Sequence, residues 1–159
     1  MVDIKTPARD DHGQVLELHQ VATEVAGATD LDTLLNRCIE MLSSAYPSSV
    51  VFILLAEEES GELVTRASSD ERVSSPDNPR RVRIGEGITG WVAEHGKTVL
   101  VNDVSQDARY IAIDPDAQAE LCVPLMMNER VFGVINLEKE GPDGYSQSDR
   151  NGIETFPAK

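Results

Sequence analysis

The sequence predicts an α+β fold in which helices gather on one face of an antiparallel sheet. Two observations lead to this class. Apolar residues follow a helical period near both ends of the chain, and between them lie short apolar runs separated by compact turns. Helices and antiparallel strands that are segregated in this way pack as layers around one core. The length of 159 residues suffices for a single domain with a sizeable core.

The N-terminal region is expected to form two helices after a short leader. Residues 1–11 are polar and are expected to be flexible. A first helix is predicted over residues 12–26, and its apolar stripe consists of Val15, Leu18, Ala22 and Val25. This stripe fits either packing within the domain or a dimer seam with a second copy of the chain, and both interpretations stay open. A second helix is predicted over residues 30–45, before Pro47.

The central region is typical of strands joined by turns. The predicted strands span residues 49–56, 62–68, 81–84, 98–101, 120–127 and 130–138. Residues 102–117 are expected to be irregular, with one helical turn at 107–110. Pro124 cannot donate to a ladder, which indicates an edge or a bulge at that point. Ser146 and Asp149 form a capping box, which predicts a last helix.

Residues 85–90 read Gly-Glu-Gly-Ile-Thr-Gly, which matches the spacing of a dinucleotide-binding turn without its context. Such a turn follows a buried strand and opens a long helix, and an acidic residue about 20 positions further on holds the ribose. Here the helix around Trp91 stops at Gly96, and Asp103 comes too early. The glycines are therefore predicted to make a sharp turn that directs Trp91 and its helix into the core.

The net charge of −14 restricts the partners of the chain. Nucleic acids and anionic membrane surfaces both require a basic face, so neither is expected as a partner. No apolar run approaches the roughly 20 residues that a membrane span needs. The two cysteines, Cys38 and Cys122, lie far apart and lack metal-ligand spacing, so no metal is expected and a reducing, cytoplasmic location is favoured.

Five motifs in order resemble the GAF domain, a small-molecule sensor related to the PAS domain. They are GEGITGWVA at 85–93, VLVNDV at 99–104, DARY at 107–110, ELCVPL at 120–125 and VFGVINL at 131–137. With the flanking helices the resemblance covers about residues 12–156, which leaves 157–159 as a tail. It implies a central sheet of five or six strands, terminal helices on one face, and crossover loops over a small-molecule pocket on the other. In that family the terminal helices commonly dimerise and signal to an attached effector.

Relatives of this fold that carry chemistry need residues that this sequence lacks. Free methionine sulfoxide reductases resemble the fold but place cysteines where Ile84 and Thr89 stand, so thiol catalysis is not expected. Bilin or haem attachment requires Cys or His in the crossover, and residues 107–119 contain neither. Cyclic-nucleotide-binding members are matched only at Tyr145 and Asp149, so this ligand is a disfavoured alternative. The resemblance therefore implies a non-enzymatic domain without a cofactor.

Strand alternation and the geometry of the family place a candidate pocket between the sheet and the crossover. The expected ligand-binding residues are Phe52, Ser68, Arg83, Ile84, Trp91, Tyr110, Glu120, Cys122 and Asn136. Arg81 and Arg83 share a face, which fits either a bound carboxylate or phosphate or the neutralisation of nearby acidic loops. The expected function is that of a regulatory module that binds an unknown small molecule, dimerises, or both, to control an effector elsewhere in the natural protein. The alternative is a dimerisation module without a ligand.

Overall fold

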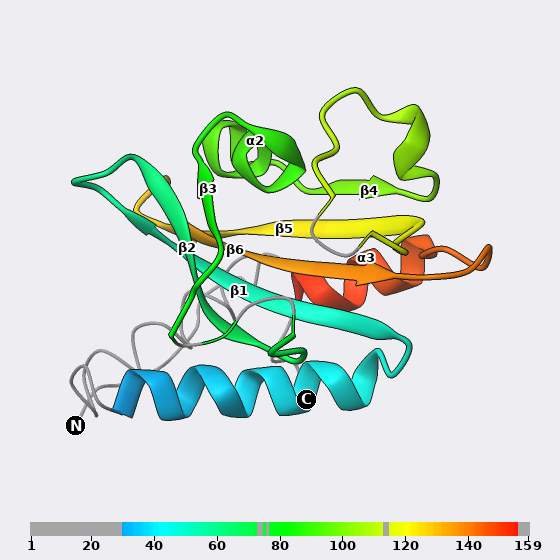
Figure 1. Ribbon diagram of the computed structural model, residues 1–159, viewed down its shortest axis with the longest axis horizontal. Coiled ribbons are helices and arrows are strands. Elements are labelled where there is room, and N and C mark those ends of the chain that lie inside the picture. Colours follow the sequence, from blue (N-terminus) through cyan, green and yellow to red (C-terminus); the bar gives the residue numbers. More distant parts are fainter. Residues whose placement is uncertain (1–29, 73–74, 76, 113–114, 156–159) are drawn as a thin grey trace.

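The fold is a curled antiparallel sheet with a layer on each face. The computed structural model describes residues 30–72, 75, 77–112 and 115–155. Within these residues a six-stranded sheet has the order β3-β2-β1-β6-β5-β4, and every pairing is antiparallel. Figure 1 shows a long helix and α3 on one face, with α2 and the crossover on the other. The predicted α+β class is confirmed.

The elements follow the predicted order along the chain. The strands are β1 (Ser49–Glu57), β2 (Glu62–Ser68), β3 (Arg81–Arg83), β4 (Val99–Val101), β5 (Ala119–Met127) and β6 (Arg130–Lys139). The helices are residues 30–45, α2 (Gly87–His95) and α3 (Gln147–Glu154), and a 3-10 helix covers Val104–Gln106. Each predicted strand is present, and its ends agree with the prediction to within one residue.

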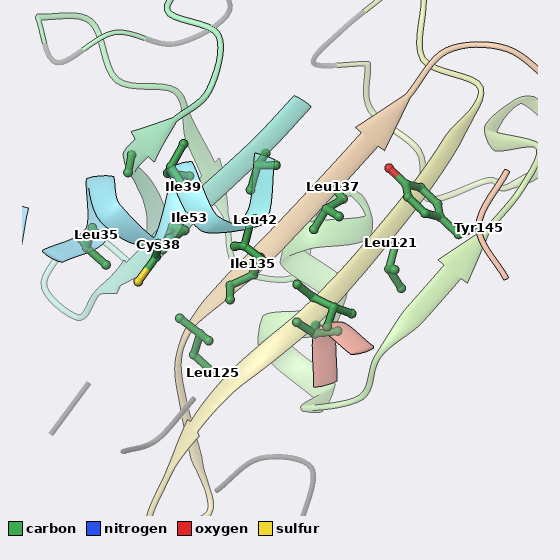
Figure 2. Packing of buried hydrophobic residues seen from close by; sticks show 14 of the residues in the cluster. Leu35, Cys38, Ile39, Leu42, Ile53, Leu121, Leu125, Ile135, Leu137 and Tyr145 are labelled. Carbon is green, nitrogen blue, oxygen red and sulfur yellow. The ribbon is translucent and has the colours of Figure 1, made fainter. Parts of the chain in front are cut away.

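Alternation along the strands divides the core into two parts. Successive side chains of a strand point to opposite faces, so Ile135 of β6 packs against the long helix while Val134 packs toward α2. The core beneath the helix over residues 30–45 and α3 is drawn in Figure 2 and includes Leu35, Cys38, Leu42, Leu121, Leu137 and Ile153. The α2-facing core includes Phe52, Leu54, Leu63, Ile88, Val92 and Cys122.

The turn between β5 and β6, together with a bulge next to it, fixes which residues of the two strands face each other. Asn128 and Glu129 have φ of 52° and 66°, the left-handed values that a two-residue hairpin turn of type I′ requires. Between Leu125 and Met126 the register then shifts by one residue, because β6 carries Phe132 as an extra residue there, and this bulge places Glu120 of β5 directly opposite Glu138 of β6. The hairpin therefore places two carboxylates on one face of the sheet.

Pro124 occupies a local edge of the sheet, in agreement with its missing amide hydrogen. Its partner on β6 is Val134. On the other side, β4 pairs with residues 120–122 of β5 and does not extend as far as Pro124. The missing donor is therefore tolerated in a strand that is internal elsewhere.

The crossover between β4 and β5 departs from the prediction in one detail. A 3-10 helix lies at Val104–Gln106, and at the predicted position 107–110 the chain makes a single turn, closed by a hydrogen bond from the Tyr110 amide to the Asp107 carbonyl oxygen at 3.1 Å. The Asp103 side chain accepts a hydrogen bond from the Ser105 amide and so begins the 3-10 helix. Asp107 begins the turn at 107–110, and its carboxylate also holds the side chain of Arg109.

The leader at residues 1–11, the helix predicted over 12–26 and the tail at 157–159 lie outside the described residues. The same holds for the predicted dimer seam of Val15, Leu18, Ala22 and Val25. These expectations therefore stay predictions. The last predicted helix is present as α3, and Ser146 and Asp149 form both hydrogen bonds of the capping box.

Candidate functional site

Three polar side chains are buried on the α2-facing side of the sheet. Glu120 of β5 is 3% exposed, and Asn136 and Glu138 of β6 are fully buried. Asn136 lies two residues before Glu138, so both point to the same face, on which Glu120 also lies. Like charges placed directly opposite each other across strands are destabilising. A core built for packing alone would have apolar side chains at these positions.

The amide of Asn136 links the two carboxyl groups. Its Nδ2 donates to Glu138 Oε2 at 3.0 Å, and its side chain also interacts favourably with the ionised form of Glu120. Asn136 Oδ1 is buried and has no hydrogen-bond partner within the part of the chain that the structure describes. Leaving a buried acceptor without a donor costs roughly 1–3 kcal/mol. This oxygen is therefore available to a donor that enters the site.

The surroundings of Glu120 favour its protonated form. Burial, followed by repulsion from Glu138, raises the pKa of Glu120 well above its usual value. Asp107 adds to this repulsion, while Asn136 and Arg109 act in the opposite direction. A carboxyl group with a raised pKa binds a proton readily, and a bound cation would compete with that proton.

The walls of the site are apolar and aromatic. Phe52 of β1 and Cys122 of β5 flank Asn136 in the sheet, and both are buried. Trp91 and Tyr110 are partly buried against the same α2-facing core. Burial raises the pKa of the Cys122 thiol well above its usual value, which disfavours the reactive thiolate.

The crossover is attached to α2 through Trp91. The guanidinium of Arg109 lies over the Trp91 ring, 4.7 Å from its centroid, and His95 stacks on Trp91 at 4.1 Å between ring centroids. Arg109 is itself oriented by Asp107, which accepts hydrogen bonds from Nε at 2.9 Å and Nη2 at 2.6 Å. The Asp107–Arg109 pair thus holds the crossover against the helix that covers the sheet.

A small cavity beneath the crossover reaches Glu120. Its volume is about 10 Å³, which is the space that a single water needs. The lining residues are Arg80, Val82, Gly87, Ile88, Thr89, Ile111 and Glu120. Arg80 Nη2 also donates to the carbonyl oxygen of Ala112 at 3.3 Å. The structure therefore shows the site closed, and a ligand larger than water requires the crossover to move.

The glycine turn next to this cavity packs closely against its surroundings. A Cβ atom added at Gly90 would lie 2.6 Å from the Arg83 carbonyl oxygen. At Gly87, where φ is 69°, an added Cβ would lie 3.3 Å from Ile111 Cδ1. No space for a phosphate is left over Gly87, which agrees with the prediction that this turn serves packing.

The structure brings most of the predicted ligand-binding residues together on the α2-facing side. These are Phe52, Ile84, Trp91, Tyr110, Glu120, Cys122 and Asn136. Ser68 and Arg83 are not part of this packed group, although Ser68 pairs with Phe52 at the end of β2. Ser68 Oγ bonds the main chain of the following loop at 3.1 Å and lines an open groove of about 340 Å³ between the helix over residues 30–45 and β2. Arg83 is exposed on β3.

The neighbouring arginine on β3 has the neutralising role that was one of the two interpretations. Arg81 Nη1 lies 3.3 Å from a carboxylate oxygen of Glu57 and 3.3 Å from one of Glu62. Both partners belong to the hairpin of β1 and β2. The arginine that lines the cavity is Arg80 instead.

Three residues of the site were missed by sequence reasoning: Arg80, Arg109 and Glu138. A signal existed for Glu138, because residues two apart on a strand share a face and Asn136 was already a candidate. Arg80 belongs to a group of arginines with Arg81 and Arg83, and Arg109 to the DARY motif, but neither lies in a regular strand or helix that would indicate where its side chain points. Their positions depend on how the loops close over the sheet.

Two other kinds of feature, a metal site and a membrane-spanning helix, find no support within residues 30–72, 77–112 and 115–155. Within these ranges, no group of three or more His, Cys, Asp or Glu side chains is placed to hold a metal ion. None of the described helices is both long and apolar enough to cross a membrane. The polar group of Glu120, Asn136 and Glu138 is the feature that calls for a functional explanation.

These features match those of a known class of domain. The family model of the GAF domain matches residues 28–156 of the chain. This range contains the whole sheet, α2, the crossover and α3. The chain therefore belongs to the GAF domain family.

Curated relatives include both a regulator and an enzyme. The chain is 26% identical over 145 residues to the Nif-specific regulatory protein of Herbaspirillum seropedicae, covering 83% of this chain and 26% of that protein. It is 22% identical over 79 residues to the free methionine-R-sulfoxide reductase of Escherichia coli, covering 50% of this chain and 48% of that protein. The chain spans less than half the length of the curated relatives that it matches.

The similar solved structures also include both a GAF domain of a larger protein and a reductase. The GAF domain of a phosphoenolpyruvate-protein phosphotransferase from Coxiella burnetii superimposes with a TM-score of 0.71 at 19% identity, covering 92% of this chain and 90% of that one. The free methionine-R-sulfoxide reductase from Neisseria meningitidis, solved with its substrate, gives a TM-score of 0.66 at 25% identity, covering 98% and 94%. GAF domains of signalling proteins and enzymes thus share this fold, and the site has to distinguish them.

Proposed function

We propose that this GAF domain is a regulatory sensor that binds a small molecule between the sheet and the crossover. The observation that carries the proposal is the buried group of Glu120, Asn136 and Glu138. Two buried carboxyl groups and the Asn136 oxygen, which has no donor among the described residues, destabilise the folded domain. A ligand that donates hydrogen bonds to them would remove this cost. The aromatic wall of Trp91 and Tyr110 would surround the rest of the ligand.

A path of direct contacts connects the site to the terminal helices. Asn102, at the start of the crossover, donates from Nδ2 to the Tyr145 carbonyl at 3.0 Å and accepts from the Tyr145 amide at 2.7 Å. Tyr145 immediately precedes the capping box of α3. Tyr46, which follows the helix over residues 30–45, donates its hydroxyl to the Asp149 carbonyl in α3 at 3.0 Å. A ligand that moves the crossover would therefore shift both helices.

The signal in this proposal is a change in the balance between two arrangements of the helices. A ligand shifts such a balance only by its difference in affinity for the two arrangements, and a shift of a few kcal/mol is sufficient. The effector that reads the signal is proposed to lie elsewhere in the natural protein. Dimerisation through the terminal helices, with the seam of Val15, Leu18, Ala22 and Val25, and a cytoplasmic location are part of the same proposal.

We propose further that the domain is not an enzyme, although relatives of this fold are named as free methionine-R-sulfoxide reductases. The whole sequence has two cysteines, and Ile84 and Thr89 occupy the positions at which the thiols of those enzymes are expected. Cys38 and Cys122 lie in the two different cores, on opposite faces of the sheet. Burial raises the pKa of Cys38 to about 11, so its thiolate is scarce at neutral pH.

A thermal-shift screen of a metabolite panel tests the proposed sensor. A compound bound at the site should raise the Tm of the wild-type domain, and the Asn136→Leu variant should lose this shift. The matched control is Asn151→Leu on the exposed side of α3, which should keep the shift. Compounds that stabilise the wild type and the Asn136→Leu variant equally would place the ligand elsewhere. A dimer that no compound stabilises would favour the alternative, a dimerisation module without a ligand.

A further inference from the structure

We infer that the group of Glu120, Asn136 and Glu138 binds a positively charged, donor-rich group, such as a primary ammonium, on the ligand. This inference rests on the proposed sensor function and names the chemical class of its ligand. The three side chains are adjacent in the β5–β6 pairing and buried on the side that faces the cavity.

The hydrogen-bonding capacity of the site is that of an acceptor. Asn136 directs its amide hydrogens at carboxylate oxygen, which leaves Oδ1 as a buried acceptor without a donor among the described residues. Glu120 lines the cavity and supplies acceptor oxygens when it is ionised. An ammonium group has three donors and no acceptor, so it can satisfy Asn136 Oδ1 and a carboxylate together. A carboxylate or phosphate would instead add acceptors and negative charge.

The charges around Glu120 point to the same class of ligand. The charged groups that act on it are Glu138 from β6, and Asp107 and Arg109 from the crossover. Asp107 holds the guanidinium of Arg109 through two hydrogen bonds, and Arg109 lies over Trp91 at the crossover. Arg80 also lines the cavity, so three carboxylates, those of Glu120, Glu138 and Asp107, stand against two arginines. A cation that enters from the crossover side therefore reaches a negative site.

The aromatic wall supports a cation as well. Trp91 already accepts the guanidinium of Arg109 over its ring at 4.7 Å. Phe52 and Tyr110 pack against the same α2-facing core as Trp91. Aromatic faces attract cations, and this attraction is stronger where water is excluded. Because Arg109 and His95 already contact the Trp91 ring, the aromatic neighbour of an ammonium beside Asn136 would be Phe52, which pairs with Asn136 in the sheet.

Binding of a cation should be linked to release of a proton. The raised pKa of Glu120 favours its protonated form as long as no cation is bound. An ammonium stabilises the ionised form of Glu120. The affinity for the ammonium should therefore rise with pH, up to the pKa that Glu120 has without a ligand. The groups that face Glu120 and set this dependence are Glu138, Asp107 and Arg109, with Arg80 lining the same cavity.

Three probes that share a butyl group test the inference: butylammonium, 1-butanol and pentanoate. Binding is followed by NMR at the side-chain amide of Asn136 in the wild type and in Glu120→Gln. The control variant is Glu40→Gln, an exposed carboxylate on the helix over residues 30–45. Butylammonium should shift the Asn136 amide, and its affinity should fall about tenfold or more in Glu120→Gln and stay within about twofold in Glu40→Gln. Glu138→Gln serves as the second variant, because either change removes one of two facing carboxylates.

The outcomes separate this inference from the proposed function. Preferential binding of 1-butanol or pentanoate at Asn136 would overturn the ammonium class and leave the sensor proposal standing. Butylammonium shifts that are spread over the acidic surface, or that survive in Glu120→Gln, would show general attraction to a negative protein and overturn the inference. If none of the probes shifts Asn136 while a metabolite stabilises the domain through Asn136, the ligand belongs to another class.

Discussion

Replacing Glu120 by Gln should stabilise the domain at neutral and alkaline pH. The substitution keeps the shape of the side chain and removes one of two carboxyl groups that face each other inside the sheet. The effect depends on pH because the ordinary pKa of a glutamate is 4.5, while burial and Glu138 raise the pKa of Glu120 well above this value in the folded state. Between these two values the folded state binds more protons than the unfolded state.

The sign and size of the effect follow from this difference. Where the folded state holds the extra proton, the free energy of unfolding falls as pH rises. The slope for one proton is about 1.4 kcal/mol per pH unit, or ~2.8 kcal/mol over two units. The contribution of Glu120 is fully present below pH 4.5 and is lost as pH rises through its folded-state pKa. The Gln side chain does not titrate, so the variant lacks this loss.

Urea unfolding at intervals between pH 4.5 and 9 measures the difference. The single tryptophan, Trp91, reports on the site by fluorescence, and circular dichroism reports on the whole fold. Glu40→Gln is the control for loss of an exposed charge. We expect the wild-type curve to fall relative to that of Glu120→Gln as pH rises. Parallel curves across the range would show that Glu120 is not held in an unfavourable environment, and the account of the site would be refuted.

Four further predictions concern packing and coupling. Gly90→Ala should destabilise the domain by about 1–3 kcal/mol in urea unfolding, because the added Cβ meets the Arg83 carbonyl oxygen at 2.6 Å; unchanged stability would show that this turn can open. Leu137→Ala should cost about 2–5 kcal/mol in the same assay, because Leu137 is fully buried beneath the helices, and a loss below 1 kcal/mol would contradict that packing. Arg109→Ala should speed hydrogen exchange in the crossover and leave β6 unchanged, since it removes the contact with the Trp91 ring; equal exchange in both proteins would deny its holding role. Asn102→Ala should leave ligand affinity within about threefold while it weakens the ligand-induced change in exchange at α3, and an undiminished change would place the coupling elsewhere.

The strands and their order could be predicted from the sequence because each carries its own pattern. β6 contributes to both cores, so it is a nearly continuous apolar run, which is typical of a strand buried on both faces. The hairpin from β5 to β6 is marked by Asn128, which adopts the left-handed conformation of the turn more readily than most residues. Such signals are local, and local signals are what a single sequence contains.

The site could be predicted only in part, because its geometry depends on register and loop closure. Alternation placed Asn136 on the correct face, but the direct pairing of Glu120 with Glu138 follows from the turn of the hairpin and from the bulge opposite Leu125 and Met126. Arg83 was a candidate because it shares a strand face with Arg81, yet the structure leaves Arg83 exposed and places Arg80 at the cavity. The path of the loop before β3 decides which of the two arginines lies at the cavity, and no local sequence pattern encodes that path.

A crystal structure of the domain with the metabolite that stabilises it most is the most direct test of a sensing site beneath the crossover. We expect the compound between β6 and the crossover, in contact with Asn136 and Glu120, with the hydrogen bonds of Arg80 and Asn102 rearranged. A compound seated in the groove between β2 and the helix over residues 30–45 would contradict the account.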